Sequence, residues 1–242
     1  MVEDLLPIEV CSRRSEVTDC ASCDVRALAV CAAMAPSELH ELDAIVRHVA
    51  HGAKSTFIHQ DEEARAVFSV TKGVVRLYKT LSDGRRQVIG FAMPGDFLGL
   101  ALHNRYGFSA DAVGDVTLCR FDRIEFDRLI TDKPHFLRRL HEFATHELVI
   151  AQEQMMLIGR RSAEERLAAF LVAMRGRWAR ITTPSVTIQL PMQRIDIADY
   201  LGLTIETVSR TLTKLARDKV ILIVPDAVRV LDEGRLAALV RG

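Results

Sequence analysis

Residues 192–220, which read MQRIDIADYLGLTIETVSRTLTKLARDKV, carry the most specific structural pattern in the chain. Apolar positions recur at helical spacing on both sides of Gly202-Leu203-Thr204, which predicts two short helices joined by a tight turn, with Thr204 capping the second. The side chains expected to be buried are Ile195, Ile197, Ala198 and Leu201 in the first helix and Val208, Leu212 and Leu215 in the second. A glycine-containing turn between helices of this size is typical of a helix-turn-helix, whose second helix enters the major groove of DNA.

The outward face of the second helix carries Glu206, Ser209 and Arg210, which their i, i+3, i+4 spacing places side by side near the helix start. Arg210 can donate two hydrogen bonds to guanine, Glu206 can accept from cytosine N4, and Ser209 is small enough to lie on a thymine. A Glu–Arg pair on a helix is usually a surface ion pair, but its position in the helix-turn-helix favours base contacts. Contacts to DNA phosphates are expected from Thr207, Thr211, Lys214 and Arg217. The strands expected between residues 220 and 231 would form a wing.

Composition and charge agree with this interpretation. The chain has 242 residues, 49% of them hydrophobic, which is enough to build two small domains. The formal net charge is zero, but it is unevenly distributed. Residues 161–242 hold 13 Lys/Arg and 9 Asp/Glu, which gives a net charge of +4, and the first 160 residues have a net charge of −4. A basic C-terminal part fits DNA contacts at one end. Because no apolar run approaches the roughly 20 residues of a membrane span and the N-terminus does not read as a secretory signal, we expect a cytoplasmic protein without membrane contact.

Residues 51–127 differ in composition from the rest of the chain, because short runs of β-branched and aromatic residues alternate with turn signals. The turn signals are Lys72-Gly73, Asp83-Gly84, Pro94-Gly95-Asp96 and Gly114-Asp115. Many short strands at this spacing predict a small antiparallel barrel or roll.

A narrow apolar stripe follows on a helix predicted from Pro134 to about Ile158. Its members alternate between spacings of three and four residues, which is typical of a coiled-coil seam. The alternative is a helix packed against its own roll, but the charged flanks favour pairing with a second copy of the chain. The residues of this stripe are Leu137, Leu140, Ala144, Leu148, Ala151, Met155 and Ile158.

Three cysteines lie close together in TDCASCDVRALAVC, near the N-terminus. The spacing Cys20-x2-Cys23-x7-Cys31 supplies three thiolates, one fewer than a zinc ion or an iron–sulfur cluster usually takes. Cys119 in the predicted strand VTLCRF is the candidate fourth ligand, although a lone cysteine in an apolar strand is usually a small core residue. Cys11 falls outside the pattern and is interpreted as a spare thiol.

Together these features resemble the CRP/FNR family of bacterial regulators, through the sensor roll, the long helix, and the motifs AEERLAAFL and IETVSRTLTKL. The resemblance covers nearly the whole chain and implies an α+β fold with a cyclic-nucleotide-binding-like β-roll, a long dimerisation helix and a C-terminal winged helix-turn-helix. The implied segments are a cysteine-rich segment at 1–35, the roll at 36–133, the dimerisation helix at 134–160 and the DNA-binding domain at 161–242. The E-T-V-S-R core is similar to that of the subgroup whose dimers read palindromic TTGAT-type half-sites.

The cysteine spacing resembles the oxygen-sensing FNR branch of the family. That resemblance implies a [4Fe–4S] cluster on Cys20, Cys23, Cys31 and Cys119, which favours dimerisation and DNA binding when oxygen is low. It also implies that the chain is mainly an activator that contacts RNA polymerase through the turn at Asp83-Gly84, although such a tip is more often just a turn.

A cyclic nucleotide is not expected. The cyclic-AMP branch has a glutamate where Leu100 follows Gly99 here, and an arginine where Phe108 precedes Ser109. A cyclic phosphate needs a cation or a cluster of amides near it, and Arg105 is out of register for that role.

Two alternatives to the oxygen sensor stay open. The same four cysteines could hold a structural zinc ion or act as a thiol-redox site. In a different functional class, Cys20-Ala-Ser-Cys23 could belong to a thiol-disulfide oxidoreductase. Such a motif requires a βαβ unit around it, which this sequence lacks. No catalytic constellation stands out, so we expect that the chain is not an enzyme.

Overall fold

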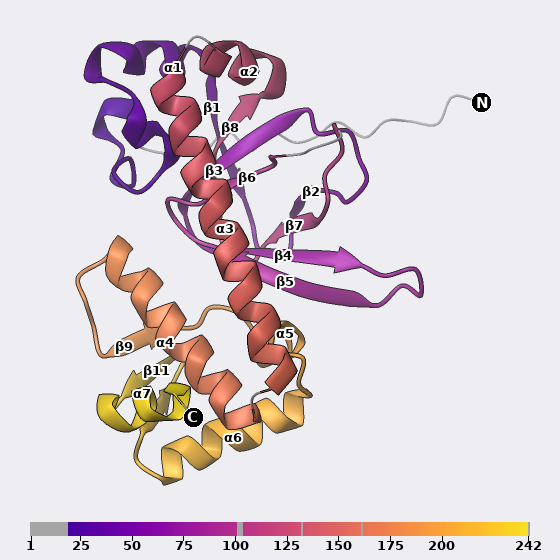
Figure 1. Cartoon of the computed structure of the whole chain (residues 1–242), viewed down its shortest axis with the longest axis vertical. Coiled ribbons are helices and arrows are strands. Elements are labelled where there is room, and N and C mark those ends of the chain that lie inside the picture. Colours follow the sequence, from indigo (N-terminus) through magenta and orange to yellow (C-terminus); the bar gives the residue numbers. More distant parts are fainter. Residues whose placement is uncertain (1–18, 101–103, 132, 161, 242) are drawn as a thin grey trace.

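The computed structural model describes residues 19–100, 104–131, 133–160 and 162–241. It confirms the predicted α+β fold, with a β-roll at one end, a long helix and a winged helix-turn-helix at the other end (Figure 1). Within these ranges no helix is both long and apolar enough to span a lipid bilayer.

The N-terminal segment packs on the roll through short helical turns. It contains the 3₁₀ turns η1 (Cys20–Ser22), η2 (Val30–Ala33) and η3 (Pro36–Glu38), and the helix α1 (Leu39–Ile45). The Asp19 side chain caps η1 by accepting from the backbone N–H of Ala21 at 2.9 Å.

The roll consists of two antiparallel four-stranded sheets, with strand orders β1-β8-β3-β6 and β2-β7-β4-β5. Its strands are β1 (Val46–His51), β2 (Thr56–Ile58), β3 (Ala66–Lys72), β4 (Val75–Thr80), β5 (Arg86–Ala92), β6 (Phe97–Leu98), β7 (Ser109–Ala112) and β8 (Val116–Asp122). Apolar side chains from both sheets, among them Phe68, Val75 and Leu118, form the core between them. Helix α2 (Arg123–Thr131) follows directly after β8.

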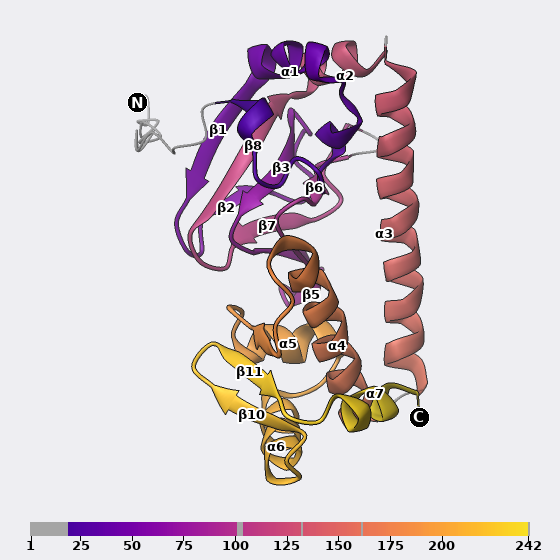
Figure 2. The ribbon, with the colours of Figure 1, turned by 90° about the vertical axis from the view of Figure 1, so that its left-hand side faces the viewer.

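Helix α3 (Pro134–Arg160) runs along one side of the molecule from the roll to the DNA-binding domain (Figure 2). Its first turns belong to the roll, because Phe136 is fully buried in a cluster with Phe121 and Phe126. Lys133, just before the helix, is tied to the N-terminal segment by ion pairs with Glu41 at 2.9 Å and Glu38 at 3.2 Å. The direction of α3 is therefore set by the roll and by the segment that carries the cysteines.

The C-terminal domain has the predicted helix-turn-helix and wing. Its elements are α4 (Ala163–Ile181), β9 (Thr187–Gln189), α5 (Arg194–Leu201), α6 (Ile205–Arg217), β10 (Ile221–Val224), β11 (Ala227–Val230) and α7 (Glu233–Arg241). Ser162 and Glu165 form the capping box that starts α4, and the wing strands pair in the order β10-β11-β9. The prediction for Ile195 was wrong: this side chain is half exposed, because it lies on the outer side of α5.

The roll and the DNA-binding domain share one hydrophobic cluster. Val88 and Phe91 of β5 pack with Phe170 of α4 and Leu201 of α5. Tyr200 adds an edge contact with the ring of Phe91 and a tilted contact with the ring of Phe170. The two domains of one chain are thus packed together through β5.

Candidate functional site

Helix α6 presents the residues predicted to read DNA bases. Gly202 ends α5 in the left-handed conformation at φ 62°, and Thr204 caps α6 by accepting from the backbone N–H of Thr207 at 3.2 Å. Glu206 and Arg210 are exposed one turn apart. Hydrogen bonds from its own backbone N–H and from Thr204 lower the pKa of Glu206, which keeps the carboxylate ready to accept a hydrogen bond.

Ser209 lies between them and is half-buried. Its hydroxyl accepts from the Arg194 guanidinium at 3.3 Å, which brings a cation from the start of α5 to the same surface. Sequence reasoning missed Arg194, because nothing in the local spacing shows that its side chain crosses to α6.

The predicted phosphate contacts differ in their surroundings. Arg217 is exposed and forms an ion pair with the adjacent Asp218 at 3.6 Å, and Lys214 forms an ion pair with Glu164 of α4. Thr211 is only 8% exposed, and its hydroxyl donates to the Thr207 carbonyl at 2.8 Å. We therefore withdraw Thr211 as a phosphate contact, because it lies on the buried side of the helix.

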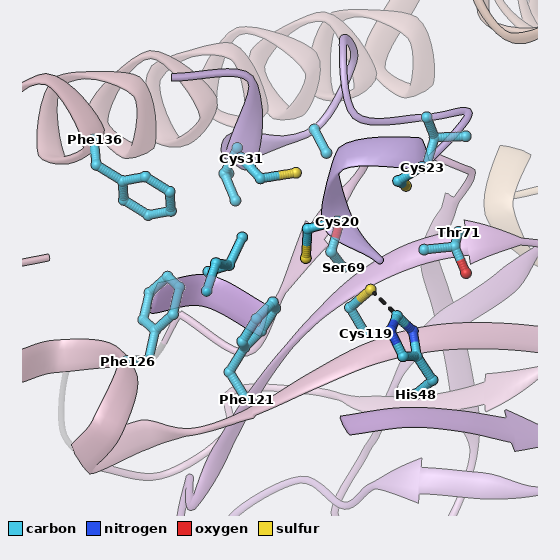
Figure 3. A pocket seen from close by; sticks show the side chains of 14 residues that line it. Cys20, Cys23, Cys31, His48, Ser69, Thr71, Cys119, Phe121, Phe126 and Phe136 are labelled. Atoms are coloured by element: carbon cyan, nitrogen blue, oxygen red, sulfur yellow. Dashed lines mark hydrogen bonds between the residues drawn. The ribbon is translucent and has the colours of Figure 1, made fainter. Parts of the chain in front are cut away.

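The four predicted cysteine ligands line one pocket (Figure 3). Cys20, Cys23 and Cys31 come from the N-terminal segment, and Cys119 comes from β8 of the roll. The remaining wall is largely apolar, with the rings of Phe121, Phe126 and Phe136 among its members. Cys11 lies outside the described residues.

The N-terminal thiols are positioned by contacts with α1. The backbone N–H of Cys20 donates to Asp43 at 2.8 Å, which holds η1 over the roll. Cys20 begins this short 3₁₀ turn and Cys23 directly follows it, so the pair is not at the start of a helix in a βαβ unit as a redox CxxC motif requires.

Burial keeps the thiols of Cys20, Cys31 and Cys119 protonated. It raises the pKa of Cys31 to about 11 and of Cys119 to about 12, and it raises the pKa of Cys20 further still, with help from the neighbouring Asp43. Thiols of this kind are inert towards solvent but lose their protons to a bound metal. Four thiols facing one pocket fit the donor set of a [4Fe–4S] cluster or of a structural zinc ion. In the described ranges no three Cys, His, Asp or Glu side chains already converge as metal ligands do, so binding would draw the sulfurs together.

Most of the predicted dimer stripe is exposed on α3. Leu148 is 57% exposed, and Leu137, Ala144, Ala151 and Met155 are exposed as well. The side chain of Ile158 lies outside the described residues. Leu140 is a correction: it is only 6% exposed and packs with Phe136 in the roll cluster, so this one position faces the roll.

Family models match both halves of the chain. Residues 165–239 match a Crp-like helix-turn-helix domain, and residues 49–133 match a cyclic nucleotide-binding domain. The transcriptional activatory protein AadR of Rhodopseudomonas palustris is 56% identical over 90% of this chain and 91% of its own length. The nitrogen fixation regulation protein FixK of Bradyrhizobium diazoefficiens is 48% identical over 91% of this chain and 93% of its own.

The chain belongs to the CRP/FNR family. Among solved structures, FixK2 from Bradyrhizobium japonicum superposes with a TM-score of 0.75 at 34% identity, over 81% of this chain and 97% of that one.

In this CRP/FNR chain the cysteine segment also reaches the DNA-binding domain through the roll. Leu28, between Cys23 and Cys31, packs so closely on Gly95 that a Cβ atom there would lie 2.7 Å from the Cβ of Leu28. The next residue, Asp96, accepts from the backbone N–H of Met93 at 2.8 Å and forms an ion pair with Arg177 of α4. A short series of contacts therefore joins the cysteine loop to α4 within one protomer.

The turn at Asp83-Gly84 forms the exposed tip between β4 and β5. Gly84 has φ 81°, and Asp83 accepts from the backbone N–H of Arg85 at 3.0 Å. Contact of this tip with RNA polymerase stays a prediction, as does the expected lack of cyclic nucleotide binding.

Proposed function

We propose that this CRP/FNR regulator is a transcription activator that senses oxygen through a [4Fe–4S] cluster. Cys20, Cys23, Cys31 and Cys119 would hold the cluster, and the chain would bind palindromic TTGAT-type sites as a homodimer when oxygen is low. The observation that carries the proposal is that thiols from two distant segments line one apolar pocket. The relatives named as activators support the direction of regulation.

A bound cluster would supply an oxygen-sensitive link between the N-terminal segment and β8. The chain's own residues determine what that link controls. Val30 and Met34 of the segment pack with Phe136 and Leu140 of α3, so a segment held against the roll also holds the start of α3. Release of the segment would remove this support from the helix.

DNA reading is assigned to the exposed face of α6. Arg210 and Glu206 would contact base edges, with Arg194 and Ser209 beside them, while Arg217 would contact phosphates. A homodimer paired along the exposed part of α3 would place two such helices on the two halves of a palindrome, as helix-turn-helix dimers do.

Anaerobic purification tests the proposal. We expect a coloured protein that contains iron and sulfide and that loses its absorption in air. The Cys119→Ala variant should hold less iron and a less stable cluster, whereas Cys11→Ala, outside the predicted ligand set, should match the wild type.

Two results would contradict the proposal. A colourless protein that contains zinc and no iron would favour the structural zinc site. A metal-free protein whose DNA affinity responds to thiol oxidants would favour the thiol-redox site.

A further inference from the structure

Cys119 lies on the central strand β8 with a polar side chain on each neighbouring strand. The register pairs it with His48 on β1 and with Ser69 on β3. Directly paired residues of antiparallel strands project from the same face of a sheet. All three side chains accordingly line the cysteine pocket (Figure 3).

His48 is already in contact with the thiol. Its Nδ1 lies 3.7 Å from the Cys119 sulfur, within the range of a hydrogen bond to sulfur. A neutral imidazole can carry its proton on Nδ1, and a charged one carries protons on both nitrogens, so His48 can donate to this sulfur in either state.

Ser69 also presents its side chain to the pocket. The residue is 5% exposed, and its hydroxyl makes no hydrogen bond to any residue that the structure describes. Thr71, two residues along the same strand, also lines the pocket, but its hydroxyl donates to the Thr117 carbonyl at 2.9 Å. Ser69 is thus a free donor next to the ligand in β8.

We propose that His48 and Ser69 are positioning residues of the cysteine centre, which donate hydrogen bonds to the sulfur of Cys119 when it binds metal. This inference rests on the proposed function, because it assigns a role towards the same ligands. An N–H or O–H donor stabilises the negative charge of a ligating sulfur, which strengthens the metal site and raises the reduction potential of an iron–sulfur cluster. The two hydrogen bonds would therefore strengthen the bond between Cys119 and the metal.

Co²⁺ titration of the metal-free, reduced full chain is the first test, with a coloured chelator as competitor. His48→Phe keeps a ring but removes both nitrogens, and Ser69→Ala removes the hydroxyl. We expect the double variant to lose about tenfold to a hundredfold in Co²⁺ affinity, the usual effect of removing such partners. Thr71→Val is the matched control and should match the wild type. His48→Gln, which retains an N–H donor, should recover part of the affinity if His48→Phe weakens the site.

The second measurement is the reduction potential of the protein reconstituted with iron and sulfide. We expect a lower potential in the double variant than in the wild type. Unchanged Co²⁺ affinity and potential in the double variant would overturn the assignment, as would an equal loss in Thr71→Val. If the wild type binds Co²⁺ through thiolates but takes up no iron, the proposed oxygen-sensing function is wrong. The roles of His48 and Ser69 are then still supported if only the variants that lack these donors lose Co²⁺ affinity. A wild type that binds neither metal overturns both.

Discussion

Arg76 in β4 and Asp196 in α5 form a buried ion pair between the roll and the DNA-binding domain. Their Nη1 and Oδ1 atoms lie 2.5 Å apart, and the side chains are 13% and 2% exposed. Arg76 also binds Asp111 of β7 through two hydrogen bonds, at 3.0 and 2.6 Å. Arg86 of β5 reaches the same Asp196 oxygen at 3.1 Å. Two arginines of the roll thus hold Asp196 of α5, and one of them, Arg76, also pairs with Asp111.

Replacing Arg76 by Met should loosen this docking. Loss of the guanidinium leaves Asp111 without its cation and Asp196 with Arg86 alone, and removal of one partner from a buried pair costs about 3 to 5 kcal/mol. We expect a lower free energy of unfolding and faster amide hydrogen exchange in α5. Arg85→Met is the control, because Arg85 pairs with Asp83 at the exposed hairpin tip. Equal exchange in the two variants would contradict the role of Arg76.

Gly95→Ala should displace the cysteine segment from the roll. Gly95 has φ 98°, and the added Cβ would meet Leu28 at 2.7 Å, so the variant adds a clash to backbone strain. We expect a loss of about 1 to 3 kcal/mol and faster alkylation of Cys31 in the metal-free protein. Gly84→Ala is the control that separates backbone strain from the clash, because Gly84 has φ 81° but an added Cβ there would meet no other atom. If both variants react alike, the contact between Gly95 and Leu28 does not hold the segment.

The sequence predicts those features of the structure that depend on neighbouring residues, and it fails for features that depend on contacts between distant residues. The turn at Gly202 and the cap at Thr204 involve neighbouring residues only, so the helix-turn-helix could be located from the sequence. The stripe on α3 has the correct helical spacing, but spacing does not say which neighbour covers each turn, so Leu140 was assigned to the wrong surface. Thr211 was misassigned because Thr and other small residues fit either face of a helix.

The positions of His48 and Arg76 could not be predicted in the same way. His48 meets Cys119 only through the pairing of β1 with β8, which connects residues far apart in the chain. Arg76 meets Asp196 only once the two domains are docked. Register and docking depend on the whole core, whereas a motif depends on a few adjacent residues.

His51 should make the roll less stable in mild acid. Its burial, partly under the ring of Phe57, lowers its pKa below the ordinary value of 6.5. The unfolded chain therefore takes up a proton first as the pH falls, so the free energy of unfolding decreases below about pH 6.5. His51→Gln should reduce this dependence in denaturant titrations between about pH 7.5 and about pH 5. The control is His59→Gln at an exposed site of the roll; an identical change in both variants would argue against His51.

Leu148→Asp should weaken dimerisation without unfolding the chain. Leu148 is 57% exposed in the described chain, so the change removes little intramolecular packing but places a carboxylate in the expected seam. We expect a shift towards monomer in analytical ultracentrifugation of the metal-loaded protein. Ile124→Asp, on the exposed face of α2, is the control. Leu140→Ala should instead lower the free energy of unfolding by about 2 to 5 kcal/mol, as a buried residue does.

Arg210→Ala should remove discrimination at one base pair of each DNA half-site. The exposed guanidinium near the start of α6 can form two hydrogen bonds to guanine, and a pair of this kind contributes about 1 to 3 kcal/mol of discrimination. Binding to half-sites with each of the four bases at that position measures the effect, and the variant should bind all four about equally.

Arg217→Ala provides the comparison, because a phosphate contact carries no sequence information. It should weaken binding to every site alike and lower the salt dependence by about one phosphate contact per protomer. A different result would be that Arg210→Ala keeps the base preference of the wild type and weakens binding to all half-sites equally. Arg210 would then contact phosphate, and the bases would be read by other residues on the face that Arg194, Glu206 and Ser209 share.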